Sequence, residues 1–314
     1  MVDFFDKVYS FQSSNKFLTK IRFFSGLRLI TKITANFVVP IYYLITRDFA
    51  PVLNKSDRKS NKRIIVSLTT FPNRIDRLWI VIESLLRQSY KPDLIILWLS
   101  KDQFNAIEEL PRRLLNQQKN GLEIKLCEHD LKSHKKYFYA LKEYTDDVIV
   151  TFDDDVLYSS KVLETLVRLN ERFPLSICCN VGHRITIGDG EILPYNQWEQ
   201  LEEMSGPSYS ISFIGVGGVL YPPGSLPKEV FNNDVFEKIC LSADDIWLKA
   251  MSLLGKTRVV KSDYFSNYLP VIHFNNKTLS SSNVSLNKND QQLKDVRSYY
   301  IQKSGIDPFS EIIS

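Results

Sequence analysis

Short apolar runs alternate with helical stripes in the middle of the chain, and this pattern limits the fold more than any other feature. Ile64–Thr70 (IIVSLTT) and Asp93–Ser100 (DLIILWLS) are runs typical of buried strands. Between them, apolar residues in positions 75–86 recur at helical spacing and form one stripe. A strand, a helix and a strand in this order make a βαβ unit, so we predict a parallel sheet.

The alternation continues downstream. Leu122–Asp130 and Asp147–Phe152 are predicted strands, and a helix is predicted over Tyr137–Tyr144. Further predicted elements are a helix ending at Arg172, a strand in Ser176–Gly182, a strand with a turn in Ser212–Leu226, and a helix over Ser242–Gly255. We therefore predict an α/β fold.

Asp153, Asp154 and Asp155 follow directly after the apolar strand that ends at Phe152. Ligands of open α/β sheets bind at the carboxyl ends of strands, and adjacent carboxylates do not all stay ionised without a nearby positive charge. Asp153 and Asp155 are two positions apart, so both can point to one side. Mn²⁺ or Mg²⁺ is usually held by one or two carboxylates plus substrate phosphates, which predicts a metal site for a diphosphate. The alternative is a solvated acidic turn.

Two adjacent lysines precede the helix predicted over Tyr137–Tyr144. Lys135 and Lys136 lie where a helix N-terminus would also favour an anion, so they are candidates to hold the phosphate. The alternative is a solvated basic turn.

Four segments, taken in order, resemble a known family. They are VSLTTFPNRI, HKKYFYALKEYTDDVIVTFDDDV, GVGGVLYPPGSL and ADDIWLKAM, which span about Arg63–His273. The pattern resembles the GT-A fold of nucleotide-sugar-dependent glycosyltransferases, and more closely the family-2-like bacterial enzymes of surface polysaccharide assembly. Where such enzymes usually have a Pro-Thr-Tyr-Asn-like turn and an Asp pair after the second strand, this chain has Thr70–Arg74 and Ser100-Lys101-Asp102. The nucleotide base is therefore not assigned.

The resemblance implies a Rossmann-like, mostly parallel sheet with flanking helices. A catalytic domain over 63–274 would have a nucleotide-sugar half (63–156) followed by an acceptor half (157–274). The implied metal ligands are Asp153, Asp155 and His273. The implied donor-binding residues are Thr69, Arg74, Asp102, Lys135, Lys136, Asp154, Gly217 and Gly218, with Asp154 facing the ribose or sugar. The implied catalytic pair is Asp244 and Asp245, with Asp245 as the general base.

The resemblance also implies the reaction. A sugar would pass from a nucleotide sugar to a hydroxyl of a glycan or lipid-linked glycan, with inversion and with Mn²⁺ or Mg²⁺ as cofactor. Two site residues have alternative roles: Asp245 can be part of a capping box that begins at Ser242, and His273 can be an ordinary packed side chain.

Residues 1–62 form a basic, aromatic arm followed by a linker. Met1–Arg63 holds 12 Lys and Arg against 4 Asp and Glu, while the rest of the chain is mildly acidic. The uncharged stretch Ile33–Thr46, broken by Pro40, is too short to cross a bilayer, which needs about 20 apolar residues. The arm is predicted either to lie on the inner face of the cytoplasmic membrane or to pack on the body. Nucleic acid is not expected as a partner, because no recognised nucleic-acid motif accompanies the charge.

The cysteine pattern and the C-terminal segment complete the expectations. Cys127, Cys178, Cys179 and Cys240 form no C-x-x-C pair and are expected to be buried and reduced. With no signal-peptide pattern in the first thirty residues, we expect a cytoplasmic, peripheral protein. Residues 275–314 are expected to form a polar tail or lid.

Two other classes of protein share part of this pattern. A phosphatase of the haloacid dehalogenase type also has Asp-x-Asp after a strand, but it expects Thr or Val at the position of Leu157 and places its nucleophile on the first core strand. A Ca²⁺-dependent carbohydrate-binding protein is the non-catalytic alternative, but its ligands usually come from spaced positions along a loop.

Overall fold

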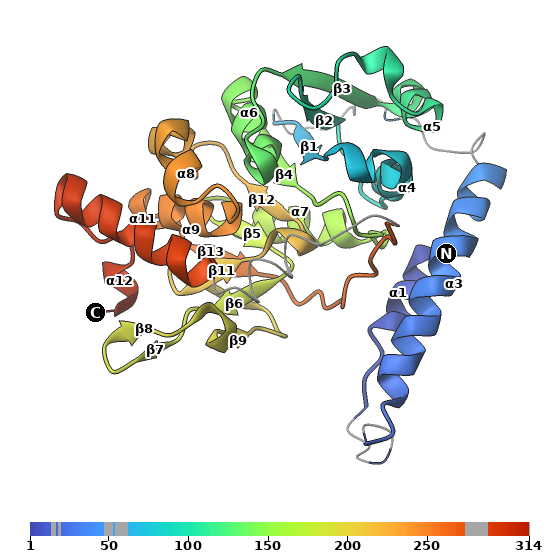
Figure 1. Cartoon of the computed structure of the whole chain (residues 1–314). Coiled ribbons are helices and arrows are strands. Elements are labelled where there is room, and N and C mark those ends of the chain that lie inside the picture. Colours follow the sequence, from blue (N-terminus) through green and yellow to red (C-terminus); the bar gives the residue numbers. More distant parts are fainter. Residues whose placement is uncertain (14–16, 18–19, 47–52, 54–61, 274–287, 314) are drawn as a thin grey trace.

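A mixed eight-stranded sheet runs through the body of the protein in the computed structural model, which describes residues 1–13, 17, 20–46, 53, 62–273 and 288–313 (Figure 1). Its strand order is β10-β13-β5-β12-β4-β1-β2-β3. The strands are β1 (Ile64–Thr69), β2 (Leu94–Ser100), β3 (Leu122–Cys127), β4 (Val148–Thr151), β5 (Ile177–Cys179), β10 (Ser205–Ser208), β12 (Val219–Tyr221) and β13 (Val259–Lys261).

Most neighbouring strands in this sheet are parallel. β1 pairs in parallel with β2 and β4, β2 pairs with β3, and β5 pairs with β13. β12 is antiparallel to β4 and β5, and β10 is antiparallel to β13. The predicted α/β fold with a mostly parallel sheet is confirmed.

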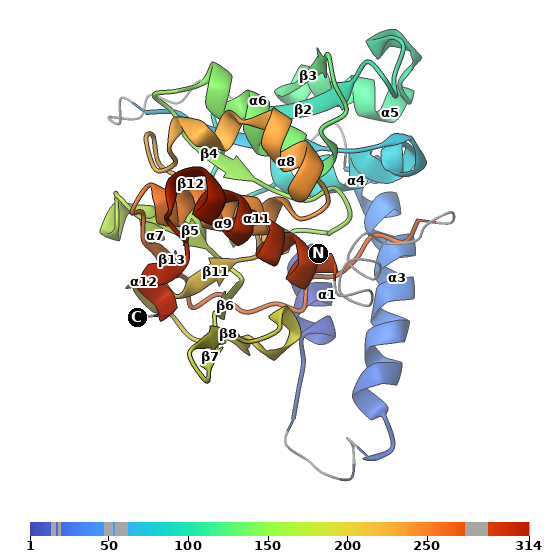
Figure 2. The same ribbon diagram turned by 60° about the vertical axis from the view of Figure 1, so that its left-hand side comes forward.

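Helices cover both faces of the first half of the sheet (Figure 2). Side chains alternate along each strand, so each strand presents apolar groups to the helices on both faces. Val66 and Leu68 of β1 join the cluster that contains the apolar face of α4 (Ile75–Leu86). Ile65 instead packs with Ala140 of α6 (Lys135–Glu143). The long apolar runs of β1 and β2 follow from this burial on both faces.

The second half of the body has its own core. It gathers residues of β5, β12 and β13 with the helices α8 (Asn233–Ile239), α9 (Asp244–Leu254) and α11 (Lys288–Ser304). The remaining elements are α5 (Arg112–Leu115), α7 (Val162–Arg172), α12 (Ser310–Ile313), β6 (Gly182–Arg184), β7 (Ile187–Gly188), β8 (Glu191–Ile192), β9 (Glu199–Gln200), β11 (Ile211–Phe213) and short 3₁₀ turns.

The C-terminal segment is not a free tail from Lys288 onward. α11 packs against α8 and α9, and its Leu293, Val296 and Tyr300 are buried in the second core. The expectation of a tail or lid fails for residues 288–313, because three apolar side chains on one face of the helix suffice to dock it. The predicted loop over 275–287 lies outside the described residues.

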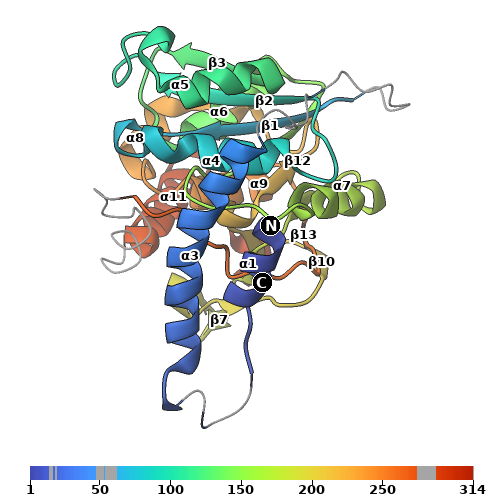
Figure 3. The same ribbon diagram turned by 90° about the vertical axis from the view of Figure 1, so that its right-hand side faces the viewer.

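The N-terminal arm packs on the body (Figure 3). It consists of α1 (Val2–Tyr9) and the long helix α3 (Phe23–Ile45), which lie side by side, and α3 also contacts α4. α3 continues through Pro40, so the predicted break is wrong. Burial of Ala35, Val39 and Tyr43 against the body offsets the backbone hydrogen bond that Pro40 cannot donate.

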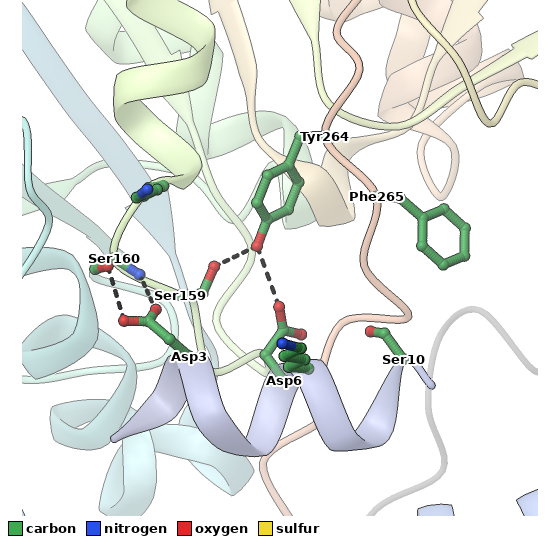
Figure 4. A pocket seen from close by; sticks show the side chains of 9 residues that line it. Asp3, Asp6, Ser10, Ser159, Ser160, Tyr264 and Phe265 are labelled. Carbon is green, nitrogen blue, oxygen red and sulfur yellow. Dashed lines mark hydrogen bonds between the residues drawn. The ribbon is translucent and has the colours of Figure 1, made fainter. Parts of the chain in front are cut away.

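Acidic side chains anchor α1 to the body. Asp3 accepts hydrogen bonds from the backbone amide and hydroxyl of Ser160, and Asp6 accepts one from Tyr264 (Figure 4). Burial raises the pKa of Asp6, and the Ser266 and Tyr264 hydroxyls oppose that rise. A cavity of about 430 Å³ lies between α1 and the body at this point.

Among the helices in the described ranges, none has the length and hydrophobicity needed to cross a membrane.

Gly218 is predicted to be intolerant of any side chain. Its φ is +83°, and a Cβ there would lie 2.4 Å from the ring of Phe152. We expect Gly218→Ala to lower the free energy of unfolding by at least about 1–3 kcal/mol, measured by urea denaturation. Gly224→Ala is the matched control, because its φ is +73° but nothing lies within 4 Å of the added atom. An equal loss in both variants would remove the Phe152 contact as the cause.

Candidate active site

The acidic triplet, a glycine turn and the start of α9 meet at the carboxyl end of β4. β12 is antiparallel to β4 and places Val219 opposite Thr151. The 3₁₀ turn Gly215–Gly217 that precedes β12 therefore lies beside Asp153, which follows β4. A Cβ on Gly215 would lie 3.4 Å from the Asp153 carboxylate and 3.3 Å from the Asp245 carboxylate. Both carboxylates thus face the same small space next to the Gly215 backbone.

Lys136 joins the two acidic groups. Its Nζ lies 2.7 Å from Oδ1 of Asp153 and 3.0 Å from Oδ2 of Asp244. Burial lowers the pKa of Lys136, but the surrounding carboxylates outweigh burial and hold it well above its ordinary value. Burial by itself raises the pKa of Asp244. Lys136 and His134 lower it by more, so the pKa of Asp244 lies below its usual range. The ammonium and the Asp244 carboxylate are therefore both charged at neutral pH.

Asp245 is set apart from its neighbour by its protonation. Its Oδ2 accepts a hydrogen bond of 3.0 Å from the backbone amide of Gly215, and the side chain remains partly exposed. Burial, and then repulsion by Asp244, raise the pKa of Asp245 to about 8. The capping alternative is not supported, because α9 has Ala243 at its N-cap and no side-chain cap hydrogen bond. Two adjacent carboxyl groups with separated pKa values are the arrangement expected of an acid–base site.

Arg74 organises the other two aspartates of the triplet. It forms ion pairs with Asp154 and, at 2.9 Å, with Oδ2 of Asp155. Thr70 donates a 2.5 Å hydrogen bond to the same Asp154 carboxylate. Burial raises the pKa of Asp154 against the effect of Arg74, and partial burial raises the pKa of Asp155 to about 6. Asp154 is buried and paired with Arg74 and Thr70, and its place next to a ribose or sugar stays a prediction.

The predicted metal ligands are present but not gathered. Among the residues that the structure describes, no three His, Cys, Asp or Glu side chains lie close enough together to hold a metal ion. Asp153 and Asp155 are paired with Lys136 and Arg74, while each keeps close to a third of its side chain exposed. His273 has a buried Nε2 without a hydrogen-bond partner, and burial with two nearby arginines lowers its pKa to about 4. Two partly exposed carboxylates are suitable donors for Mn²⁺ or Mg²⁺, so the donor chemistry of Asp153 and Asp155 fits, although the two are not gathered with His273 into a site.

Several other predicted donor-binding residues have structural partners instead. Lys135 is buried in an ion pair with Asp130, so it does not lie against the acidic triplet. Asp102 accepts a hydrogen bond from the Asp130 backbone amide, and Thr69 donates one to the Trp98 carbonyl.

The two predicted glycines serve packing. A Cβ on Gly217 would lie 2.6 Å from Val181 and 2.7 Å from the Tyr268 hydroxyl, while Gly218 abuts Phe152. Close approach of these two backbones to a donor or acceptor stays a prediction. Gly215 is the glycine of this turn that borders the carboxylates.

Thr70 and Gly215 are the site residues that the sequence-based prediction missed. Thr70 stands one position after the predicted Thr69, and side chains of successive strand residues point to opposite faces. Gly215 belongs to the predicted glycine-rich segment, and its spacing from Gly217 gives no reason to prefer either glycine as the site residue.

The buried cysteines are as expected, since all four are free and buried.

Comparison with known families bears on the middle of the chain. Residues 68–218 match the family model described as Glycosyl transferase family 2. This range begins at the last two residues of β1, includes the acidic triplet and the glycine turn, and ends before the Asp244–Asp245 pair. No curated protein matches the chain.

Solved structures with a similar course of the chain are distant in sequence. The mannosyltransferase PcManGT from Pyrobaculum calidifontis, in complex with GDP-Man and Mn²⁺, is 15% identical with a TM-score of 0.48, over 90% of this chain and 78% of that chain. TarS from S. aureus is 15% identical with a TM-score of 0.42, over 79% of this chain and 74% of that chain. A CMP-2-keto-3-deoxy-manno-octonic acid synthetase with CTP is 9% identical with a TM-score of 0.41, over 74% of this chain and 99% of that chain. These likenesses transfer no ligand or reaction to this chain.

Proposed function

We propose that the chain is a family-2-like glycosyltransferase that moves a sugar, with inversion, from a nucleotide sugar to a hydroxyl of a glycan or lipid-linked glycan in surface polysaccharide assembly. The proposal rests on one observation: Asp153 and Asp245 face the same space beside Gly215. Asp153 is the carboxylate suited to the donor side, and Asp245 is the carboxyl group with a raised pKa. Both border one point, as a single displacement requires.

Asp245 is the general base of the proposed reaction. It accepts the proton of the acceptor hydroxyl while that oxygen attacks the anomeric carbon from the face opposite the leaving group. The Gly215 amide holds the Asp245 carboxylate in place, and burial together with Asp244 keeps the pKa of Asp245 high enough for it to take up a proton near neutral pH.

Asp153 and Asp155 are the proposed ligands of Mn²⁺ or Mg²⁺, with His273 as a further candidate. When bound, the ion neutralises charge on the leaving diphosphate. Lys136 is ion-paired with Asp153, and Arg74 with Asp155. Both cations would therefore place positive charge beside the phosphates of a donor held at this site.

The decisive experiment is a panel of nucleotide sugars tested with and without Mn²⁺, first for thermal stabilisation and then for transfer to a glycan acceptor. A ligand that binds the native state raises its stability, so the true donor is expected to raise the melting temperature when Mn²⁺ is present. If no nucleotide sugar stabilises the protein, the assignment of the site is wrong. Release of phosphate from a generic ester would instead support the phosphatase class.

The arm is the proposed contact with the inner face of the cytoplasmic membrane, where a lipid-linked acceptor would be found. α3 buries one face on the body and exposes Ile30, Ile33, Phe37, Ile41 and Leu44 at helical spacing on the other. Basic residues near the start of the helix, Lys20, Arg22, Arg28 and Lys32, suit an anionic surface.

Loss of this apolar stripe is expected to weaken membrane binding. In the double variant with Ile33→Ser and Phe37→Ser, each side chain that would enter the interface loses about 1.5 kcal/mol or more of hydrophobic binding free energy. The affinity for the membrane should therefore fall by at least about tenfold. Cosedimentation with vesicles that contain anionic lipid measures the change. Leu175→Ser is the matched control, because that side chain is 86% exposed but lies outside the arm. Equal binding of all three proteins would contradict the membrane contact.

A further inference from the structure

The arm contacts the segment beside the acidic triplet through a buried side chain, Asn36 of α3. This residue is 8% exposed and belongs to the helix face that packs on the body. Its Nδ2 donates a 2.8 Å hydrogen bond to the carbonyl of Pro270, and its Oδ1 accepts a 2.8 Å hydrogen bond from the amide of Ile272. The side chain thus pairs with both backbone groups that flank Val271, as a neighbouring strand would.

The other edge of the same segment is paired with the residues that follow the acidic triplet. The Val271 amide donates a 2.8 Å hydrogen bond to the carbonyl of Asp155, and Leu157 donates one of 2.9 Å to the carbonyl of Leu269. An antiparallel bridge between Val156 and Pro270 completes this contact. Residues 269–272 therefore lie between α3 and the backbone of Asp155.

The arm holds the preceding part of this segment as well. Asp6 accepts hydrogen bonds from Tyr264 and Ser266, and the Ser10 hydroxyl accepts one of 2.8 Å from the amide of Asn267 (Figure 4 shows α1 with Asp6, Ser10 and Tyr264). From α4, Arg77 donates a 2.9 Å hydrogen bond to the backbone carbonyl of Asn36, which fixes the helix at that point. The contacts form a continuous set from the arm to Asp155.

We propose that Asn36 is a positioning residue of the donor site: it holds residues 269–272 against Asp155, so the arm sets the orientation of that carboxylate. The inference rests on the proposed function for the role of Asp155 as a metal ligand. Its physical basis is general: groups behind a metal ligand fix its direction, and their loss weakens metal binding although they never touch the ion. A helix outside the family-matched range, 68–218, is thereby made part of the site.

Two substitutions in the full-length protein test this role. Asn36→Ala removes both hydrogen bonds to the segment, whereas Asn36→Asp keeps the acceptor for Ile272 and loses the donor to Pro270. Thr31→Ala is the matched control, because Thr31 lies on the same buried face but its hydroxyl donates to Leu27 of its own helix.

The first readout is the Mn²⁺ concentration for half-maximal transfer. We expect Asn36→Ala to raise it by roughly 10- to 100-fold, with the KM for the acceptor unchanged and with Thr31→Ala like wild type. A merely structural role would lower the amount of active enzyme without moving this concentration. An unchanged Mn²⁺ requirement in both Asn36 variants would overturn the proposal.

The second readout needs no activity. Hydrogen exchange of the Val271 and Ile272 amides, measured without ligand, is expected to be at least about tenfold faster in Asn36→Ala than in Thr31→Ala. In Asn36→Asp, which keeps the acceptor for Ile272, the faster exchange is expected at Val271. Unchanged exchange in the Asn36 variants would show that the arm does not hold this segment and would also overturn the proposal. If Asn36→Ala does not fold, Asn36→Asp decides both readouts. If wild type transfers no sugar, the proposed function fails while the exchange measurement still decides the link between arm and segment.

Discussion

Asp245→Asn is expected to lower the turnover number for sugar transfer by about 10²–10⁴-fold while leaving donor binding intact. The amide has nearly the shape of the carboxyl group, and its oxygen can still accept the hydrogen bond from Gly215. It has no lone pair basic enough to take the acceptor proton, so the chemical step alone is lost. Steady-state kinetics measures the turnover, and donor-dependent thermal stabilisation measures binding.

The controls separate this role from two others. Asp263→Asn, an exposed aspartate, should transfer sugar as wild type does. Normal turnover in Asp245→Asn would eliminate Asp245 as the base. Loss of donor-dependent stabilisation would make Asp245 a donor ligand rather than a base.

The raised pKa of Asp245 gives the same assignment a pH signature. A base must be deprotonated, and burial and Asp244 raise the pKa of Asp245 to about 8. The ratio kcat/KM, which reports the free enzyme, should therefore rise about tenfold per unit as pH increases toward about 8 and level off above it. Asp244→Asn removes the repulsion by Asp244, so the rise of kcat/KM should occur at lower pH in this variant. A rise at the same pH as in wild type would contradict the effect of Asp244 on the pKa of Asp245.

The local patterns of the sequence predicted the elements because their causes are local. Strand-forming runs and helical stripes gave β1, α4 and β2, since burial on one or both faces dictates the spacing of apolar residues. The same logic placed Asp153–Asp155 at a carboxyl strand end. It failed at Pro40, where packing of α3 on the body outweighs the lost backbone hydrogen bond.

The pairings within the site were not predictable in this way, because they join residues far apart in the chain. Lys136 and Lys135 are neighbours of equal charge, yet one contacts Asp153 and Asp244 while the other is buried against Asp130. Successive residues at the start of a helix point in different directions, and only the packed fold decides which direction meets the site. The contact from Asn36 to Pro270 spans an even longer separation and carries no sequence motif.

Arg74→Met is expected to lower the free energy of unfolding by about 3–5 kcal/mol, because it leaves the buried Asp154 carboxylate without its charged partner. Thr70 alone supplies a neutral hydrogen bond, which does not offset the desolvation of the charge. Urea denaturation at pH 7 measures the loss. Arg168→Met is the control, since the surface ion pair of Arg168 with Glu164 is expected to contribute little to stability.

Neutralising the partner as well should recover most of this stability. Asp154→Asn in the Arg74→Met background removes the buried charge, so the double variant is expected to be more stable than Arg74→Met alone.

The stability defect of Arg74→Met should also depend on pH in one direction. Burial already raises the pKa of Asp154, and loss of Arg74 raises it further, so the ionised form is disfavoured in the folded state. The defect of Arg74→Met should therefore shrink as pH falls toward 5 and grow as pH rises, whereas a loss that is independent of pH and of Asp154 would assign Arg74 a packing role.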